Sequence, residues 1–296
     1  MTRTTWILVA ILLALIGVAV LVLQQPGEQS VSSQEGEFLA TYDSAAIDRM
    51  DIVLRAESIT LQKEGTAWML TSPLRAPADA RSIANAIGKG KSTRLSGLIS
   101  SNPEKQSLFQ VDSSGTLVRM YEKGTERAAF RIGKPGPGYT DTYVRREGAI
   151  GVYLADGMLT QIFGKPSRDW RDKAILSITP EAVRSVRFHY GDTTFSLQAQ
   201  DSLWSVDGVP ATEHVVRSFL SALSALQADE FVDTALTGIP PLVGMLDVDG
   251  TQLGFHRVPG DNMMTVITSR TTQVYRIYSW RGDQVLKRKN DFITGQ

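Results

Sequence analysis

The stretch 47-IDRMDIVLRAESITLQKEGTAWMLTSPLRAPADARSIANAI-87 recurs in pattern 136 positions later, as 183-VRSVRFHYGDTTFSLQAQDSLWSVDGVPATEHVVRSFLSAL-223. Ten of the thirteen large apolar residues of the first copy meet a large apolar residue of the second without a gap. The pairs are Ile47/Val183, Met50/Val186, Ile52/Phe188, Leu54/Tyr190, Ile59/Phe195, Leu61/Leu197, Trp68/Trp204, Leu70/Val206, Ile83/Phe219 and Ile87/Leu223. Few positions are identical, so the shared pattern alone predicts an internal repeat.

Each copy first alternates apolar and polar residues and then changes to helical spacing. Residues 50–54, 59–61 and 68–70 alternate as short strands with one buried face do. Ile83 and Ile87 lie four apart after the capping candidate Asp79, which is typical of a helix. The second copy keeps this order. The sequence therefore predicts an α+β fold with two related modules, each an antiparallel sheet with a packed helix.

Further elements complete the two modules. We expect strands at 95–99, 117–121, 129–132, 142–145 and 151–154 in the first module and at 246–248, 252–258, 264–268 and 273–278 in the second. The run Gly133–Gly138 favours a wide hairpin loop, because a phosphate-binding loop would need a helix directly after it. One helix from Trp280 to Lys289 is expected to close the chain, with its basic residues suiting the helix dipole.

The N-terminal residues indicate a membrane anchor. Trp6 to Leu23 carry no charge and are close to the ~20 residues that cross a bilayer as a helix. An uncleaved anchor is favoured over a removed signal peptide, because no small-residue cleavage site follows. Arg3 precedes the span and acidic residues follow it, so we expect a cytoplasmic N-terminus in the inner membrane and an extracytoplasmic remainder. The expected domains are 1–23 (cytoplasmic N-terminus and anchor), 24–40 (flexible tether), 41–166 (first module), 167–182 (junction) and 183–296 (second module).

Composition excludes several classes of function. Lys+Arg and Asp+Glu both total 31, so no basic excess favours nucleic acid. The absence of cysteine excludes disulfides, thiolate metal sites, a cysteine nucleophile and a lipidated cysteine. No serine lies in a GxSxG motif, and His189, His214 and His256 are scattered without ligand spacing. We therefore predict no catalytic, cofactor-binding or metal-binding residues.

Two short motifs have simpler explanations than ligand binding. Residues 85–92, NAIGKGKS, lack the first glycine of a P-loop and follow a helical pattern, which favours a lysine-rich helix end. Residues 247–250, DVDG, have two carboxylates but none of the later ligands of a calcium loop, which favours a hairpin turn. Trp68 and Trp204 could stack on sugars, but their matching strand positions favour core residues of the repeat.

A cluster of charges lies near the module junction in the sequence. Residues 168–173, RDWRDK, alternate in sign around a tryptophan and could lock the modules by ion pairs, bind a partner or remain solvated. The candidate residues for partner or inter-module contact are Arg145, Arg146, Arg168, Arg171 and Lys173. An internal ion-pair role is favoured for the last three.

Several motifs give the chain a family resemblance. They are Trp68–Pro73 followed by Ala76–Asp79, then Thr142–Arg145 with Val152–Leu154, then Arg171–Lys173 before Ile175 and Leu176. In these the chain resembles the bacterial family called domain of unknown function 4340, over about residues 38 to 232. It departs from the family pattern at Ser107–Asp112, where a tyrosine-glycine-leucine-aspartate run is usual. The resemblance implies a single-span envelope protein, often encoded beside ABC transporter subunits of the gliding-motility type, with no catalytic residues to carry over.

These observations together predict a non-enzymatic accessory or scaffold protein of a membrane complex. The expected partners are the inner membrane and a membrane protein such as ABC transporter subunits, and no cofactor is expected. An envelope protein that binds a glycan or another ligand is the main alternative, and an envelope hydrolase is the third. Exposed aromatic residues in a cleft would favour the first alternative, and two facing carboxylates would favour the second.

Overall fold

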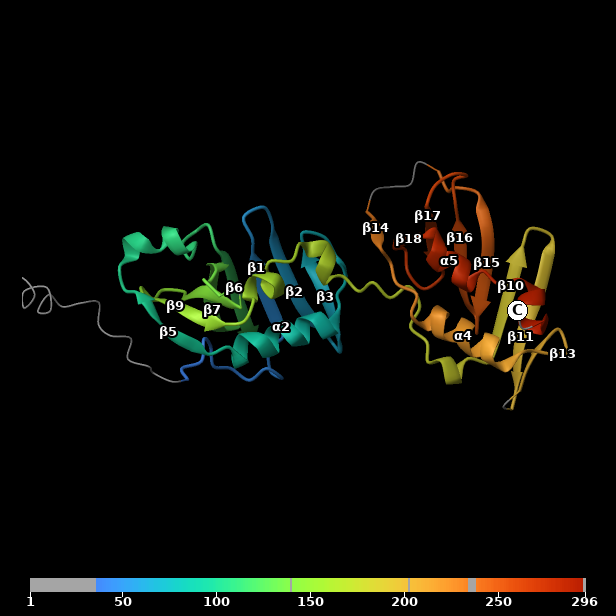
Figure 1. Cartoon of the computed structure of the whole chain (residues 1–296), viewed down its shortest axis with the longest axis horizontal. Helices are drawn as coiled ribbons and strands as arrows, with labels where there is room; N and C mark the ends of the chain where they lie inside the picture. The colour runs from blue at the N-terminus through green and yellow to red at the C-terminus, as the bar shows by residue number, and fades with distance from the viewer. Residues whose placement is uncertain (1–35, 139, 202, 234–237, 295–296) are drawn as a thin grey trace, which may run out of the picture. The chain divides into compact units, whose positions relative to one another are not determined.

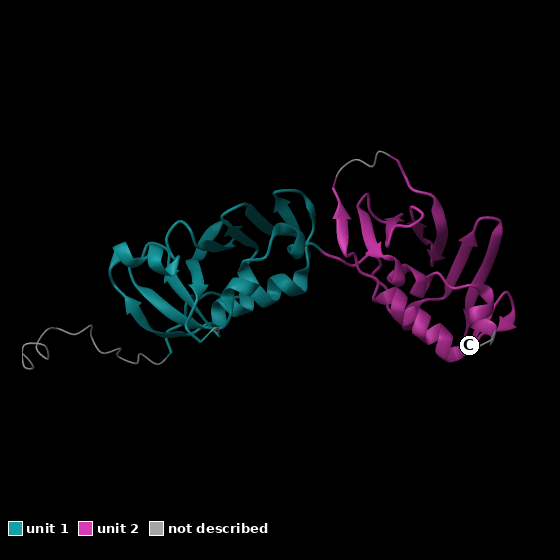
Figure 2. Ribbon diagram, turned by 45° about the horizontal axis from the view of Figure 1, so that its top comes forward, with its two compact units in different colours: residues 1–171 teal, residues 172–296 magenta. Residues whose placement is uncertain are grey.

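The computed structural model describes residues 36–138, 140–201, 203–233 and 238–294. The chain divides between Arg171 and Asp172 into two compact units, called unit 1 and unit 2 (Figure 2). Among the described residues, no helix has both the length and the apolar character needed to cross a membrane. The predicted anchor, Trp6–Leu23, lies outside the described residues.

Unit 1 is an antiparallel sheet with helices against it. Its strands in chain order are β1 (Arg49–Val53), β2 (Ser58–Glu64), β3 (Ala67–Ser72), β4 (Ala76–Pro77), β5 (Leu95–Ser100), β6 (Thr116–Glu122), β7 (Thr125–Pro135), β8 (Asp141–Arg146) and β9 (Val152–Asp156). Its helices are α2 (Ala80–Ser92) and α3 (Leu159–Phe163), with the short 3-10 turns η1 (Pro103–Lys105), η2 (Ser107–Phe109) and η3 (Ser167–Trp170).

Unit 2 is also an antiparallel sheet with helices against it. Its strands are β10 (Ser185–Tyr190), β11 (Thr193–Gln200), β12 (Leu203–Val206), β13 (Val209–Pro210), β14 (Glu230–Val232), β15 (Leu242–Val248), β16 (Thr251–His256), β17 (Met263–Thr268) and β18 (Val274–Tyr278). Its helices are η4 (Pro180–Ala182), α4 (Glu213–Ser224), α5 (Ser279–Val285) and α6 (Lys289–Thr294).

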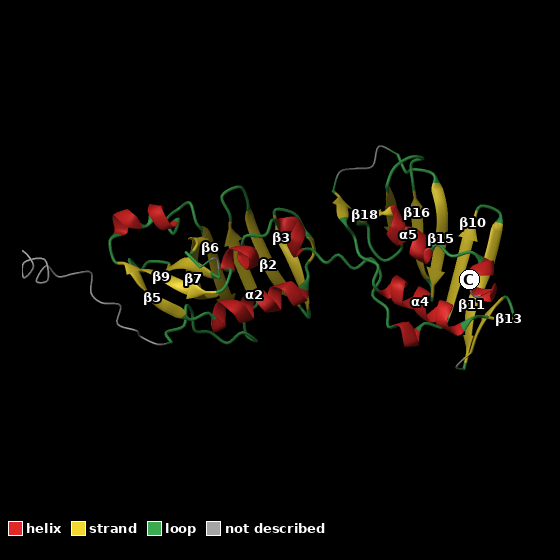
Figure 3. Ribbon diagram, in the orientation of Figure 1, coloured by secondary structure: helices red, strands yellow, loops and turns green. Residues whose placement is uncertain are grey.

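The two described sheets have the same strand order. In unit 1 it is β4-β3-β2-β1-β6-β7-β8-β9-β5, and in unit 2 it is β13-β12-β11-β10-β15-β16-β17-β18-β14 (Figure 1). In each unit the long helix connects the two edge strands in the sequence and therefore crosses one face of the sheet, as Figure 3 shows for α2 and α4. The predicted α+β fold with two related modules is thus confirmed.

The strand pairing confirms the spacing of 136 residues between the copies. Met50 lies opposite Leu61, and Val186 lies opposite Leu197. The next hairpin repeats this agreement, because Leu61 faces Leu70 in unit 1 and Leu197 faces Val206 in unit 2. A shift of one residue would move every apolar side chain of a strand to the other face of its sheet. The apolar pattern therefore set the register correctly in both units.

The same spacing is wrong for the helices. The buried residues of α2 are Ile83, Ala86, Ile87 and Gly90, and those of α4 are Val216, Phe219, Leu220 and Leu223. These sets match at 133 residues, so Ile83 corresponds to Val216 rather than to Phe219, and Ile87 to Leu220 rather than to Leu223. The cause is the preceding turn: Leu70 pairs with Ala76, six residues on, whereas Val206 pairs with Val209, three residues on.

Each copy of the repeat begins before its predicted first residue, which was 41 in unit 1 and 183 in unit 2. The Leu95 amide donates to the Glu37 carbonyl at 2.8 Å, and the Ala228 amide donates to the Lys173 carbonyl at 2.8 Å. The repeat thus begins at residue 37 in unit 1 and at residue 173 in unit 2. Residues 37–40, predicted as tether, therefore belong to unit 1.

The predicted junction at 167–182 is likewise divided between the units. The helix-capping amides of Asp79 and Thr212 donate to the carbonyls of Trp170 and Phe292, at 2.8 and 2.7 Å. Trp170 and Phe292 are fully buried aromatic residues, and they occupy equivalent positions in the two units. Residues 167–171 therefore complete unit 1, and unit 2 begins at Asp172.

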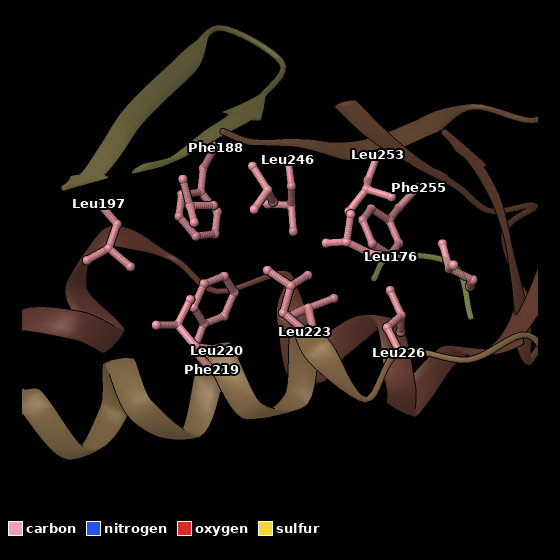
Figure 4. Packing of buried hydrophobic residues seen from close by; sticks show 14 of the residues in the cluster. Leu176, Phe188, Leu197, Phe219, Leu220, Leu223, Leu226, Leu246, Leu253 and Phe255 are labelled. Atoms are coloured by element: carbon pink, nitrogen blue, oxygen red, sulfur yellow. The ribbon is translucent and has the colours of Figure 1, made fainter. Parts of the chain in front are cut away.

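Each unit has its own hydrophobic core between the sheet and the long helix. In unit 2, Phe219, Leu220 and Leu223 of α4 point toward Phe188 and Leu246 of the sheet (Figure 4). The core of unit 1 is built in the same way, with Ile83, Ala86 and Ile87 of α2 against the sheet residues. Burial of such faces supplies most of the stability of an amphipathic helix.

The two cores differ at one contact between helix and sheet, where unit 1 has the smaller helix residue and the larger sheet residue. A Cβ atom on Gly90 would lie 2.6 Å from the Tyr42 hydroxyl and 3.5 Å from the Phe130 ring. Unit 2 has Leu223 at the Gly90 position, and Leu253 at the Phe130 position of the sheet register. The unit with the smaller helix residue thus has the larger sheet residue, as close packing requires.

The predicted helix from Trp280 to Lys289 is two helices. α5 ends at Val285 and α6 begins at Lys289, so Lys289 opens a helix instead of ending one. At the break between them, the Tyr190 hydroxyl donates to the Lys287 carbonyl at 2.8 Å. The break turns the chain so that Phe292 enters the core, where it packs against Phe219 at 5.4 Å between ring centroids.

Candidate functional site

Arg145 is a structural residue of unit 1. Its guanidinium donates to the carbonyls of Val111 and Ala149, both at 2.9 Å, and lies 3.4 Å from a Glu147 carboxylate oxygen. Arg131 pairs with the same carboxylate at 2.8 Å. The hydrogen bond from Arg131 to Glu147 lowers the pKa of the Glu147 carboxyl, although partial burial raises it. Since only 11% of the Arg145 side chain is exposed, its charge is directed inward.

Arg146 connects the start of the repeat to the sheet. Its guanidinium donates to the carbonyls of Leu39 and Phe38, at 3.0 and 2.6 Å, and pairs with Glu37 at 2.9 Å. The backbone segment that Arg146 binds is the one that leads from residue 36 into unit 1. Its role is therefore to fix this entry segment on the sheet.

The three residues from the 168–173 cluster differ from one another. Arg168 is exposed, whereas Arg171 is 2% exposed and forms an isolated β-bridge with Ala78 beside β4. Lys173 begins the repeat of unit 2. Within unit 1, five strands lie between β4, near Arg171, and β8, which carries Arg145 and Arg146. At about 4.8 Å between neighbouring strands this separation is roughly 29 Å, so the predicted arginines do not form one patch.

Trp68 and Trp204 occupy equivalent positions in the two sheets. Trp68 pairs with Lys63 and Trp204 with Ala199, a spacing of 136 residues for both partners. The Trp68 carbonyl accepts from the Ala78 amide at 3.0 Å, and the Trp204 carbonyl accepts from the Ala211 amide at 2.8 Å. Both indoles are half-buried and pack against the edge of their core. They are core residues that retain an accessible side.

A cavity of about 220 Å³ lies beside Trp204 in unit 2. Val216 and Leu220 of α4 and Pro180 of η4 line its apolar part. Its charged part consists of the side chains of Glu181, Arg184, Asp201, Glu213 and Arg217. The sequence pattern gave no indication of this site, because its residues come from η4, β11, β12, α4 and two connecting segments. A comparison of the two copies at the correct helix spacing would have shown that four of these five residues face uncharged residues in the first copy, whereas Arg184 faces Asp48.

Exposed apolar side chains gather at one end of unit 1. Seven large apolar side chains are exposed in its described residues, and four of them lie around β5: Leu98, Ile99, Leu108 and Ile150. We call these four residues the β5 end. Single exposed apolar residues are ordinary, whereas a contiguous group marks an interaction site.

Local contacts bring the members of the β5 end together. The Gln106 side-chain amide donates to the Ile150 carbonyl at 3.1 Å, which holds the η1–η2 segment and its Leu108 beside residue 150. A Cβ atom on Gly151 would lie 3.2 Å from a Leu98 methyl group, so Leu98 is adjacent as well. Ile99 lies at a register shift between β5 and β9. The sequence signal was weak, because these residues belong to an irregular edge strand and two loops.

Two sequence motifs and a second cavity remain to be placed in the described residues. Among them, no group of three or more His, Asp or Glu side chains could hold a metal ion. Asn85–Ser92 lies in the last two turns of α2, and Asp247–Gly250 forms the β15–β16 hairpin, as predicted. A second cavity in unit 2, near β14, contains Arg276, whose charge pairs with Asp261 at 2.9 Å and Glu230 at 3.6 Å.

Comparison with known proteins identifies a family. A family model described as "Domain of unknown function (DUF4340)" matches residues 68–239. No curated protein and no solved structure matches the chain. The matched region runs from β3 of unit 1 past β14 of unit 2, so it includes parts of both units. Because the match covers more than half of the 296 residues, the chain belongs to the DUF4340 family.

Proposed function

We propose that this protein is a membrane-anchored, non-enzymatic accessory subunit that docks a membrane partner on the β5 end. The partner we expect is a membrane subunit of an ABC transporter. The observation that carries the proposal is the group of four exposed apolar side chains at this end, of which Leu108 is 61% and Ile150 is 55% exposed. An apolar surface of this kind is stabilised when a partner removes it from water.

The position of the β5 end relative to the predicted anchor supports a partner in or near the membrane. Residues 37–39 run antiparallel to residues 93–95, so the chain enters unit 1 directly beside the start of β5. Twelve residues, 24–35, separate the predicted anchor from the described chain. At about 3.3–3.6 Å per extended residue they reach roughly 40 Å at most. The anchor thus keeps the β5 end near the bilayer and raises the effective concentration of a membrane partner.

Side-chain contact is a better docking mode here than addition of a strand. β5 is an edge strand, but its pairing with β9 shifts register twice, between Leu95 and Gly97 and between Leu98 and Ser100. Register shifts of this kind bend an edge and interrupt the regular row of backbone groups that another strand would need. The partner is therefore expected to cover the apolar side chains of the β5 end without extending the sheet.

The test compares charged substitutions inside and outside the β5 end. The full-length variants Leu108→Asp and Ile150→Asp are purified from solubilised membranes, and the co-purifying proteins are quantified by mass spectrometry. Val53→Asp serves as the control, because Val53 is an exposed apolar residue of unit 1 (39%) outside the β5 end. We expect each β5-end variant to lose at least about tenfold of one membrane partner, since a buried unpaired carboxylate costs several kcal/mol, and Val53→Asp to retain it.

Two results would contradict the docking proposal. One is that folded Leu108→Asp and Ile150→Asp variants retain every partner of the natural protein. The other is that the natural protein brings down no membrane protein at all. Ligand binding would then replace docking as the proposed function.

The proposed topology has a separate test. A reporter that is active only outside the cytoplasm, fused after Gln296, is expected to be active. The full-length protein should also stay in the membrane fraction. A shortened soluble product would show that the segment Trp6–Leu23 is removed.

A further inference from the structure

The cavity beside Trp204 has the features of a ligand site that the proposed docking function does not use. It lies in the groove between α4, η4 and the β11–β12 hairpin, and unit 2 alone provides its walls. Val206 is fully buried, and Trp204 lies two residues before it on the same face of β12. The indole therefore lies on the helix side of the sheet and forms a wall between the core and solvent.

The charged groups around this cavity combine acceptors and donors. Glu181, Asp201 and Glu213 provide carboxylates, whereas Arg184 and Arg217 provide guanidinium groups. The Arg184 guanidinium is fixed, because it donates to the carbonyls of Glu181 and Val183 at 2.9 and 3.1 Å. Arg217 and Glu213 form an ion pair one helical turn apart, and each side chain is 76% exposed. The polar atoms that this pair leaves unused are therefore open to a ligand.

This mixture of charges restricts the class of ligand. Two guanidinium groups disfavour an organic cation, and three carboxylates disfavour an anion. A purely apolar ligand would desolvate charged groups without replacing their hydrogen bonds. A hydroxyl group both donates and accepts, so a neutral polyhydroxylated ligand can satisfy both kinds of group at once. Its apolar ring face can pack on an indole.

The size of the cavity narrows the class further. Its volume of about 220 Å³ is below the range of roughly 300–1,000 Å³ that is usual for drug-sized ligands. One pyranose ring with its hydroxyl groups is a ligand of suitable size. The cavity opens to solvent along the exposed Glu213–Arg217 side, so neighbouring rings of a longer chain could extend outward.

The first copy of the repeat shows that the fold itself does not need these charges. At the corresponding positions of unit 1, Ala45, Ala80 and Ala84 replace Glu181, Glu213 and Arg217. The spacing is 136 residues for the first and 133 for the other two, as the strand pairing and the helix caps fix it. Both units nevertheless have the same strand order and helix placement. The shared strand order therefore does not depend on Glu181, Glu213 and Arg217, whereas the Arg184 position has a charged residue in both units, Asp48 in unit 1.

From these observations we infer that the Trp204 cavity binds one pyranose ring of a neutral carbohydrate. The ring face packs on Trp204. The Glu213 carboxylate and the Arg217 guanidinium bind hydroxyl groups at the open side, and Glu181 and Arg184 bind hydroxyl groups on the opposite side.

The test is saturation-transfer NMR on the full-length protein. The probes are the methyl glycosides of glucose, galactose, mannose and N-acetylglucosamine, with arginine methyl ester and acetate as charged comparisons. Any detergent must lack a sugar headgroup, because such a headgroup would compete for the site. We expect at least one glycoside, and neither charged probe, to receive saturation.

Matched variants connect the binding to this cavity. Glu213→Ala/Arg217→Ala gives α4 the two alanines that unit 1 has at these positions, and both side chains are exposed, so folding is retained. We expect this variant and Trp204→Ala to raise the dissociation constant of the glycoside at least about tenfold. Trp68→Ala, the equivalent change in unit 1, is expected to leave it unchanged.

Several results would overturn the inference. They are the absence of transfer to every glycoside, binding of arginine methyl ester instead, or unchanged glycoside binding by Glu213→Ala/Arg217→Ala. Because Trp204→Ala also removes core contacts, the exposed double variant is decisive if the tryptophan variant fails to fold. None of these outcomes depends on docking at the β5 end, which the Leu108 and Ile150 variants test separately.

Discussion

Two glycines of α2 should respond in opposite directions to the same substitution. A Cβ atom on Gly88 would meet nothing within 4 Å, whereas a Cβ atom on Gly90 would lie 2.6 Å from the Tyr42 hydroxyl and 3.0 Å from the Met120 methyl group. Alanine in a helix interior is favoured over glycine by about 0.5–1 kcal/mol. Gly88→Ala is therefore expected to stabilise unit 1 by this amount.

Gly90→Ala gains the same helix preference but must displace a packed neighbour. Overpacking a core costs about 1–3 kcal/mol. Moving the Tyr42 side chain also weakens its 2.7 Å hydrogen bond to the Ile87 carbonyl, which contributes about 1 kcal/mol. After subtraction of the helix preference, we expect Gly90→Ala to destabilise unit 1 by about 1–3 kcal/mol.

Native-state hydrogen exchange of the full-length protein can measure both effects. A factor of ten in exchange corresponds to about 1.4 kcal/mol, so the slowest amides of β1 and β6 should exchange about 5- to 150-fold faster in Gly90→Ala. The same amides should exchange about 2- to 5-fold more slowly in Gly88→Ala. Peptides from unit 2 provide an internal reference, because their core is separate.

A double variant tests the proposed cause. Tyr42→Phe removes the hydroxyl nearest to the new methyl group, so it should be less destabilising in the Gly90→Ala background than in the natural protein. If Gly90→Ala is as stable as the natural protein, or if the two changes are additive, the close approach of α2 to Tyr42 does not limit this position.

Three further predictions concern stability. Trp170→Ala removes a fully buried indole and should lower the free energy of unfolding by about 3–5 kcal/mol in urea unfolding. Trp68→Ala should lower it by less, because Trp68 is half-buried. Equal losses of unfolding free energy would contradict this reasoning. Asp79→Ala removes the carboxylate that accepts from the Arg81 and Ser82 amides, and should cost about 1 kcal/mol in the same assay. Thr212→Ala should cost less, because the Thr212 side chain makes no cap bond and only a 3.4 Å hydrogen bond to the Ile293 carbonyl. The hydrogen bond with Arg131 lowers the pKa of Glu147. The stabilisation by Glu147 is therefore complete above the ordinary carboxyl pKa and is lost as the pH falls through the lower, folded-state pKa. If the urea midpoint decreases with falling pH, below about pH 4.5, as steeply in Glu147→Gln as in the natural protein, this prediction is contradicted.

The sequence predicted the repeat and most strands because a buried sheet face imposes a period of two on apolar residues. Ile52 and Phe188 differ in size and identity, yet both are fully buried at the same register position. The helix spacing was mispredicted because the turn before α4 is three residues shorter, and the helical periodicity of three to four residues hides a shift of that size. Ile83/Phe219 therefore looked as good as the true pair Ile83/Val216.

The candidate sites were harder to predict, since each depends on long-range neighbours. Arg145 and Arg146 were predicted as candidates for partner or inter-module contact, but backbone carbonyls from residues 34 and 107 positions earlier in the chain accept their hydrogen bonds. An internal ion-pair role was favoured for Arg171 from its alternating charged run, but the run gave no indication that Arg171 is buried beside β4. Periodicity describes the face of an element and carries no information on which distant segment covers it.

The duplication separates what the fold requires from what each unit adds. Both units keep the strand order, the helix across one face and the aromatic residue whose carbonyl accepts from the helix-capping amide. The exposed apolar residues of the β5 end belong to unit 1, whereas Glu181, Glu213 and Arg217 belong to unit 2, where unit 1 has alanines. Features shared by the copies are sufficiently explained by packing. Packing does not explain the features confined to one copy. Substitutions at those features should alter binding and leave the fold intact.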